Sequence, residues 1–352
     1  DTFIYHISLL LFMLAAFTTL QNAEKVKRFL QKKEVLHHEY LPLKEMQTIY
    51  FPITKRITMP NAKVVTTKFS FPIKKKPQTI DQLLKSKLTA TQLKLIPRSQ
   101  EIIGKIMILE VPDQLKKKEK LIAETYLKLN NSIETVVRKD KIHSGVYRTR
   151  TVKILAGKRT KETTHYENGI TLQLHLEKTY YSARTANERL RIAKQVKPQE
   201  DVLVMFSGAA PYVLVIAQNA RPKKIYGIEI NPMAHSYAGK NIIMNGFSSI
   251  VKLFEGDVRK IIPIIKKKFD RIVMPLPKIA EEFFNVALSK IKPGGIIHLY
   301  AFLHENEVAL YKKKIRDIAK QSKKSIQIQR YVKCGQFSPG TFRMCFDIKL
   351  KK

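Results

Sequence analysis

Acidic residues are scarce in this chain. Asp and Glu together number 29 among 352 residues, against 65 Lys and Arg, so the formal net charge is +36. The basic residues occur throughout, in runs such as 74–76, 116–118 and 312–314. So large a positive excess attracts polyanions, and nucleic acid is the partner we expect. A general bias toward solvated surface lysines is the alternative reading, because the charge is not confined to one stripe.

Cysteine is nearly absent, and the histidines are scattered. Cys334 and Cys345 are the two cysteines, too few for a disulfide framework or a zinc cluster. So little cysteine is typical of the reducing cytoplasm, where we expect this protein to act. The nine histidines show no spacing typical of metal ligands. We therefore expect no metal.

A hydrophobic run long enough to span a bilayer is also missing. The apolar stretch at residues 7–20 is shorter than the roughly 20 residues of a membrane-spanning helix. No Lys or Arg precedes it, although a signal peptide has a basic start. We expect Met13 to be the biological start, residues 14–20 to form a first strand, and no membrane partner. A membrane anchor is the less favoured reading.

Two nucleotide-binding motifs are absent. The sequence contains no G-x-G-x-x-G after a strand, which disfavours an NAD enzyme. It contains no G-x-x-x-x-G-K-[ST], which disfavours an NTPase. Dinucleotide reduction and P-loop hydrolysis are therefore not the expected chemistries.

The organisation along the chain indicates several domains, as the length suggests. Strand and helix patterns predict a small α+β domain over residues 13–72, and the Pro- and Lys-rich residues 73–80 read as a linker. A mixed α/β extension follows at 81–184. From 185 to 352 strands and helices alternate, which predicts a mainly parallel sheet with helices on both faces.

Some of the predicted elements are specific enough to be tested. We expect one strand over residues 102–110 and one helix over 112–129. A turn is expected at 292–295, where the sequence reads KPGG. The last two strands, near 325–332 and 342–350, are expected to form an antiparallel pair at the sheet edge.

Three polar or flexible positions follow successive strands of the alternating region. Gly208 lies in the first loop, Glu229 comes 21 residues later at the end of the next strand, and Asp257 follows the third. Ligands bind beyond the carboxyl ends of parallel strands, and an acid about 20 residues after the glycine is typical of ribose binding. The three positions together predict a nucleoside-binding edge, with Asp257 at the base.

Four segments carry a family resemblance. They are SGVYRTR at 144–150, ILAG at 154–157, TTH at 163–165 and YSARTANERLR at 181–191. They resemble the archaeal and eukaryotic tRNA (guanine-37-N1)-methyltransferase family. The resemblance implies a class I (Rossmann-like) methyltransferase domain with an α/β N-terminal extension and a small α+β N-terminal domain that grips tRNA. It also implies S-adenosylmethionine as cofactor, tRNA as partner and, we expect, a monomer.

The resemblance assigns roles to individual residues. The catalytic arginine of the family falls on Arg148, and its general base falls on Glu188. Guanine N1 carries a proton that a carboxylate must remove, and a guanidinium can stabilise the charge that builds on O6. Arg184 matches an arginine on the cofactor side. The competing readings are that Glu188 lies on a solvated helix face with weak ion pairs, and that Arg148 only binds phosphate.

The remaining cofactor positions depart in part from the family pattern. The resemblance places cofactor contacts at Phe206, Gly208, Pro275 and Pro277, in addition to the residues named above. The sequence has Val204 for a usual Asp, Ala210 for a usual Gly, and Pro275 for a usual Asn. Two alternatives therefore stand beside methyl transfer: an aminocarboxypropyl transferase acting on the same tRNA position, and a catalytically weakened tRNA-binding relative.

Overall fold

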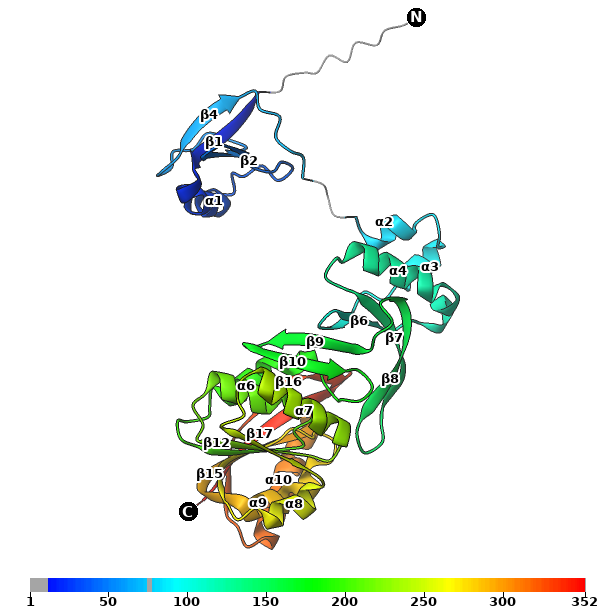
Figure 1. Ribbon diagram of the computed structural model, residues 1–352, viewed down its shortest axis with the longest axis vertical. Coiled ribbons are helices and arrows are strands. Elements are labelled where there is room, and N and C mark those ends of the chain that lie inside the picture. Colours follow the sequence, from blue (N-terminus) through cyan, green and yellow to red (C-terminus); the bar gives the residue numbers. More distant parts are fainter. Residues whose placement is uncertain (1–11, 75–77, 352) are drawn as a thin grey trace, which may run out of the picture. The chain divides into compact units, whose positions relative to one another are not determined.

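The computed structural model describes residues 12–74 and 78–351, which fall into two compact units divided between Thr79 and Ile80 (Figure 1). Residues 7–11 of the apolar stretch and 75–77 of the expected linker lie outside the described residues. Within the described residues, no helix has both the length and the apolar composition needed to cross a membrane.

The first unit is an antiparallel sheet packed on one helix. Its strand order is β2-β3-β1-β4, and the first strand, expected over residues 14–20, spans Met13–Thr19. Helix α1 buries Val26 and Leu30 against the sheet residues Ala16 and Phe51. The elements are β1 (Met13–Thr19), the 3-10 turn η1 (Leu20–Asn22), α1 (Ala23–Lys32), β2 (Leu43–Glu45), β3 (Thr48–Pro52) and β4 (Lys63–Thr67).

The second unit begins with a four-stranded sheet of order β5-β6-β7-β8. Short helices and α4 cover it, and Ile122 and Tyr126 of α4 pack on Met107 and Leu109 of β6. The elements are α2 (Ile80–Leu84), α3 (Ala90–Lys94), β5 (Glu101–Ile103), β6 (Ile106–Leu109), the 3-10 helix η2 (Asp113–Lys118), α4 (Glu119–Leu129), β7 (Thr135–Ser144) and β8 (Thr149–Gly157).

One expectation for this region is wrong and another is confirmed. The single strand predicted over 102–110 is a hairpin, because Gly104 takes φ +54° and turns β5 back on β6. Hydrophobic periodicity does not reveal this break, because the apolar pattern continues across it. The segment 112–129 is helical as predicted: it begins with the 3-10 helix η2, and regular α-helix starts at Glu119.

A hairpin of β9 (Glu162–Glu167) and β10 (Ile170–His175) lies over two helices of the main sheet. The side chain of Asn241 accepts a hydrogen bond from the backbone N–H of Gln173 and donates one to its carbonyl. Asn245 makes the same pair of bonds to Thr171. These asparagine side chains therefore join the extension to the main sheet.

The main sheet has seven strands in the order β13-β12-β11-β14-β15-β17-β16. Strands β13, β12, β11, β14 and β15 are parallel, as the alternation predicts. The order reverses between β11 and β14, and this is the switch point where such sheets bind ligands. The strands are β11 (Asp201–Met205), β12 (Lys224–Glu229), β13 (Val251–Glu255), β14 (Phe269–Met274), β15 (Ile291–His304), β16 (Ile326–Ser338) and β17 (Thr341–Leu350).

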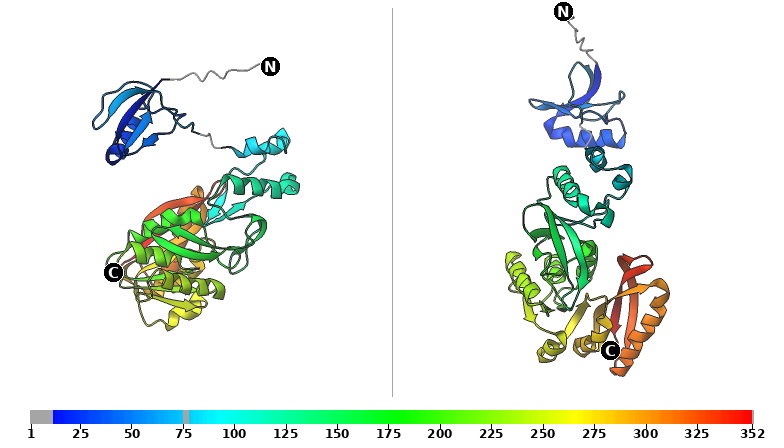
Figure 2. Two further views of the ribbon diagram at one scale, coloured as in Figure 1. Left: turned by 45° about the horizontal axis from the view of Figure 1, so that its top comes forward. Right: turned by 90° about the vertical axis from the view of Figure 1, so that its right-hand side faces the viewer.

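Helices cover both faces of this sheet (Figure 2). Val202 and Val204 of β11 point to one helix layer, and Leu203 and Met205 point to the other. One layer contains α5 (Ala186–Ala193), α6 (Pro211–Asn219) and α7 (Pro232–Met244), and the 3-10 turn η3 (Ala183–Thr185) leads into it. The other contains α8 (Val258–Ile264), η4 (Ala280–Phe283), α9 (Phe284–Lys290), η5 (Glu305–Glu307) and α10 (Val308–Gln321).

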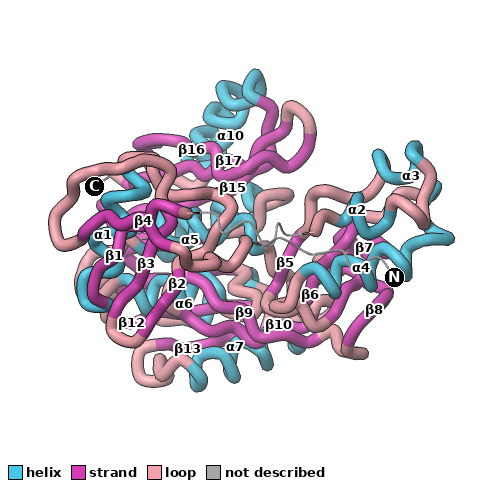
Figure 3. Tube along the Cα trace, turned by 90° about the horizontal axis from the view of Figure 1, so that it is seen from above, coloured by secondary structure: helices cyan, strands magenta, loops and turns pink. Residues whose placement is uncertain are grey.

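The last two strands form the antiparallel edge that the sequence predicts, with β17 between β15 and β16 (Figure 3). The turn expected at 292–295 is wrong as a break between elements, because β15 already begins at Ile291. The glycines instead produce an irregularity in the pairing with β14, where Gly294 has φ +80°. In the strand order, β14 and β15 lie between the switch point and β17.

Candidate active site

A pocket opens at the carboxyl ends of β11 and β14, at the switch point. Four of the residues predicted to hold a cofactor line it: Phe206, Gly208, Pro275 and Pro277. The other walls come from the segment before α5, the start of α6 and two strand residues. These walls include Tyr180, Tyr181, Ser182, Arg189, Tyr300 and Arg343. The sequence-derived cofactor edge is thus assembled in part by the fold.

The loop after β11 has an unusual backbone. Phe206, Gly208 and Ala210 have φ values of +58°, +57° and +71°, and non-glycine residues in this region cost roughly 1–3 kcal/mol each. Such strain persists only where the surrounding structure enforces it, and it concentrates at ligand sites. Ser207 Oγ in the same loop is buried and has no hydrogen-bond partner among the described residues. The loop therefore exposes polar and backbone groups to a ligand.

Glu229 lies directly behind this loop. Its carboxylate accepts hydrogen bonds from the backbone N–H of Gly208, at 2.7 Å, and of Asn231, at 2.8 Å. Burial raises the pKa of Glu229, and these backbone N–H groups partly offset that effect. The carboxylate joins the loops that follow β11 and β12, although Glu229 itself does not line the pocket.

Asp257 and Arg184 lie away from the lining. Asp257 caps α8, and a hydrogen-bonded ion pair with Arg259 lowers the pKa of Asp257. Arg184 is exposed, which gives no support to a role on the cofactor side. Asp257 and Arg184, which were expected to contact the cofactor, thus do not line the pocket, whereas Gly208 and Phe206 do.

Glu188 is buried on the first turn of α5. Arg191 donates to both of its oxygens, at 2.6 and 2.7 Å, and the hydroxyl of Tyr300 donates to Oε1 at 2.5 Å. Glu188 is 6% exposed and Arg189 is 2% exposed. The reading of this segment as a solvated helix face is therefore wrong.

The ion pair at Glu188 continues into a buried network. Arg191 also donates to Asp347, and the same carboxylate accepts bonds from His298 and Arg330. The other ring nitrogen of His298 is hydrogen-bonded to Arg271, and Arg271 forms an ion pair with Glu200. Burial lowers the pKa of His298. The network fixes α5 to the antiparallel edge of the sheet.

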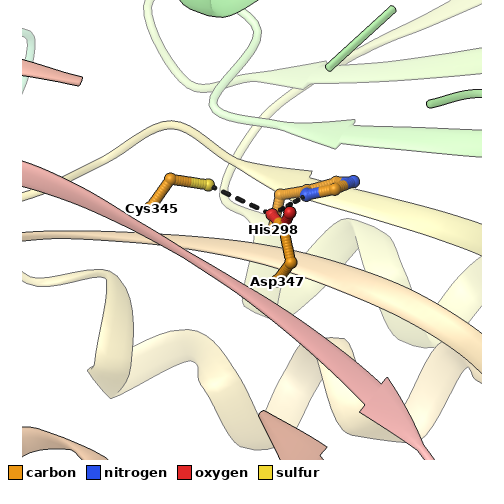
Figure 4. A group of neighbouring side chains, drawn as sticks. All are labelled: His298, Cys345 and Asp347. Atoms are coloured by element: carbon orange, nitrogen blue, oxygen red, sulfur yellow. Dashed lines mark hydrogen bonds and ion pairs between the residues drawn. The ribbon is translucent and has the colours of Figure 1, made fainter. Parts of the chain in front are cut away.

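One part of this network has residue types that bind metals. Ligand atoms of His298, Cys345 and Asp347 lie within 4.8 Å of one another (Figure 4). The Asp347 carboxylate, however, already accepts bonds from two guanidinium groups as well as from His298. Neighbouring positive charges disfavour a bound cation. We interpret the group as an element of the ion-pair network.

Arg148 lies in the turn between β7 and β8, with φ +51°. Burial and, to a smaller extent, the charge of Arg343 lower the pKa of Arg148, while Tyr180 acts in the opposite direction. Arg343 and Tyr180 both line the pocket and contact each other. Arg148 is thus within electrostatic range of two pocket residues, although it does not itself line the pocket.

Sequence reasoning missed Tyr300, Arg343 and Ser207. Tyr300 belongs to a buried strand and is 1% exposed, so its pattern predicts only core packing. Arg343 lies in the final strand, far along the chain from the motifs. Its buried Nε has no hydrogen-bond partner among the described residues. No local pattern brings Tyr300 and Arg343 to the switch point; the strand order does.

Comparison with known proteins identifies the family. A model described as the TRM5/TYW2 methyltransferase domain matches residues 163–329, and one described as the TYW2 N-terminal domain matches 80–160. The tRNA (guanine(37)-N(1))-methyltransferase Trm5b of Pyrococcus abyssi is 34% identical over 258 residues, 73% of this chain and 76% of that protein. The chain belongs to the TRM5/TYW2 family of tRNA-modifying enzymes.

The relatives in the TRM5/TYW2 family are named for different activities at position 37 of tRNA. A tRNA(Phe) (4-demethylwyosine(37)-C(7)) aminocarboxypropyltransferase of Pyrococcus horikoshii is 30% identical and covers 78% of this chain and 96% of its own. The solved complex of aTrm5 with tRNALeu has a TM-score of 0.68 at 26% identity, covering 96% and 100%. The solved structure of Trm5 of Methanocaldococcus jannaschii in complex with adenosine has a TM-score of 0.63 at 26% identity and covers 96% of this chain and 99% of its own. The class I fold with its α/β extension is thereby confirmed.

The departures from the TRM5/TYW2 pattern now have structural positions. Ala210 keeps the left-handed backbone that a glycine would favour. Val204 is fully buried in β11, a place where an unpaired carboxylate is costly. Pro275 lines the pocket and offers a ring in place of an amide.

Proposed function

We propose that this chain transfers the methyl group of S-adenosylmethionine to N1 of guanine at position 37 of tRNA, next to the anticodon. One observation carries the proposal. Tyr300 lines the switch-point pocket, and its hydroxyl donates a hydrogen bond to the buried carboxylate of Glu188. A proton acceptor beside a pocket at the switch point fits removal of the N1 proton.

The pocket suits the proposed cofactor. Ser207 offers a buried hydroxyl without a partner among the described residues, and Gly208 leaves room for a ligand near its backbone, since an added Cβ would meet only Tyr180 O at 3.7 Å. Phe206, Pro275 and Pro277 supply apolar walls. These residues would hold S-adenosylmethionine, and Glu229 would fix the loop that contacts it.

When bound, S-adenosylmethionine supplies an electrophilic methyl group on a sulfonium. The residues of the chain provide the remaining requirements. Glu188 accepts the proton of N1, so that the nitrogen lone pair becomes available. Arg148 stabilises the negative charge that develops on O6 of the guanine. Positioning of the base against the pocket supplies the rest of the rate enhancement.

Aminocarboxypropyl transfer is the second candidate, and the relative from Pyrococcus horikoshii favours it. Arg184 does not help to separate the two reactions, because it is exposed and outside the pocket lining. Glu188 supports methyl transfer to a nitrogen that must lose its proton. The C7 position of a wyosine precursor requires no N–H deprotonation before attack.

The proposal is tested by product analysis. Purified protein is incubated with labelled S-adenosylmethionine and either an unmodified tRNA transcript with guanine at position 37 or a tRNA that carries 4-demethylwyosine there. Nucleoside mass spectrometry then identifies the product. N1-methylguanosine from the first tRNA supports the proposal. An aminocarboxypropyl product from the second tRNA alone supports the second candidate function instead. If neither tRNA gives a product, the protein binds tRNA without modifying it.

Replacing Glu229 with alanine is expected to weaken cofactor binding by about 1–3 kcal/mol, or roughly 5- to 150-fold in Kd. The substitution leaves the N–H groups of Gly208 and Asn231 without their acceptor and releases the loop. Calorimetry with S-adenosylmethionine measures the change. Glu255→Ala is the matched control, because Glu255 pairs in register with Glu229 on β13 but is exposed. An unchanged Kd for Glu229→Ala removes Glu229 from the cofactor site.

Binding of tRNA is expected to weaken steeply with salt, with a log–log slope of roughly −3 to −6, because bound lysines release counterions. Removal of residues 1–72 is expected to weaken tRNA binding more than it slows methyl transfer at saturating tRNA. Filter binding over a salt series and single-turnover kinetics provide the two measurements. If the chain without residues 1–72 binds tRNA as tightly as the full chain, the first unit does not bind tRNA.

A further inference from the structure

One side chain, Tyr300, contacts both the proposed general base Glu188 and the pocket. Among the described residues that line the pocket, Glu188 does not occur, whereas Tyr300 does. Tyr300 Oη donates to Glu188 Oε1 at 2.5 Å. Tyr300 therefore contacts both the pocket where a nucleobase would bind and the carboxylate that would accept its proton.

Glu188 is held in this retracted position. Arg191 binds both of its oxygens, and Asp347 in turn binds Arg191 at 3.0 Å. To reach the pocket directly, the carboxylate would have to break these bonds and leave the half-buried guanidinium of Arg191 with fewer partners, which is costly. The geometry thus favours movement of a proton over movement of the carboxylate.

We propose that Tyr300 relays the proton of the substrate nitrogen to Glu188. The inference rests on the proposed function. In the step, the N–H bond of the base breaks and its proton bonds to Tyr300 Oη, while the proton of Tyr300 bonds to Glu188 Oε1. Tyr300 ends as a phenol again, Glu188 ends protonated, and the electron pair of the N–H bond remains on nitrogen for attack.

The surroundings of Tyr300 favour a concerted transfer. Burial raises the pKa of Tyr300 well above its usual value, so a phenolate with a lifetime of its own is disfavoured. The ring is held edge-on against Tyr212, with centroids 6.1 Å apart. A rigid donor at hydrogen-bond distance from its acceptor suits the transfer of two protons in one step.

Tyr300→Phe tests the relay, because it removes only the hydroxyl. We expect the single-turnover rate of methyl transfer to fall by roughly 10²-fold or more, with the Kd values of tRNA and S-adenosylmethionine within about twofold of wild type. Tyr311→Phe is the control: Tyr311 is also buried and also contacts a carboxylate, Glu281, but lies outside the pocket lining. A Tyr300→Phe rate within threefold of wild type overturns the relay.

A measurement on the wild-type protein separates a relay from mere orientation of Glu188. Single-turnover rates in mixtures of H2O and D2O are expected to give a curved dependence on deuterium fraction, because two protons move. In Tyr300→Phe the dependence is expected to become linear. A linear wild-type dependence overturns the relay even if Tyr300→Phe is slow. Absence of N1-methylguanosine from the wild-type reaction refutes the proposed function instead, so the two failures are distinct.

Discussion

Glu188→Gln is expected to slow methyl transfer to guanine N1 by roughly 10²–10⁴-fold, the usual consequence of removing a general base. Glutamine keeps the size of the side chain and can still accept a hydrogen bond from Arg191. It cannot accept the proton that Tyr300 or the substrate would deliver. Because the loss lies in the transition state, binding of tRNA and cofactor is expected to change little. Single-turnover kinetics and equilibrium binding measure the two quantities.

Glu200→Gln provides a matched control. Glu200 is likewise bound through both oxygens by an arginine, Arg271, at 2.8 and 3.1 Å, but it lies outside the pocket lining. Its replacement is expected to lower stability while leaving the transfer rate near that of wild type. A near-normal rate for Glu188→Gln on tRNA with guanine at position 37 would falsify the assignment of Glu188 as base. The proton acceptor would then have to be sought elsewhere.

Part of the architecture could be predicted from local patterns. Strand and helix alternation indicates the parallel region, because each buried strand and each amphipathic helix has its own periodicity. The edge pair of β16 and β17 was also expected, and it forms. The turn at Gly104 was missed because a turn inside an apolar run changes the backbone without changing the hydrophobic pattern. Periodicity thus predicts the layers better than the breaks.

The site was only partly predictable for a related reason. Gly208, Phe206, Pro275 and Pro277 follow strands whose carboxyl ends meet, so the general rule for parallel sheets brings them to one pocket. Glu188 and Tyr300 are 112 residues apart. Their contact depends on the order of strands in the sheet, which no single segment encodes.

The residues that hold Glu188 in place were also only partly predictable from the sequence. Arg191 follows from the motif, but its partner Asp347 lies 156 residues further along the chain. The resemblance to a family supplied the residue that carries the chemistry. The structure adds the residues that orient it, and these come from the antiparallel edge rather than from the motif.

Asp347→Asn is expected to lower the free energy of unfolding by about 3–5 kcal/mol, the usual result of breaking a buried ion pair. Asp347 is 1% exposed and accepts bonds from His298 at 2.6 Å, Arg330 at 2.7 Å and Arg191 at 3.0 Å. An asparagine leaves Arg191 without this charge, so Glu188 alone must neutralise it. Denaturant unfolding at pH 7 measures the loss. Asp317→Asn is the control: it changes an exposed aspartate of α10 and is expected to alter stability by less than about 0.5 kcal/mol.

The difference in unfolding free energy between wild type and Asp347→Asn should depend on pH, because Asp347 is charged. Burial by itself raises the pKa of Asp347, but the hydrogen bonds from His298, Arg330 and Arg191 outweigh it and hold the pKa far below its usual range. A carboxyl with a lowered pKa in the folded state stabilises the fold above its unfolded value of about 3.9. That contribution is lost as the pH falls through the folded value. The gap between wild type and Asp347→Asn is therefore expected to be full at pH 7 and to narrow below about pH 4. A gap that stays constant down to pH 3 would show that the carboxylate charge does not stabilise the fold, and that the network beneath Glu188 acts through packing alone.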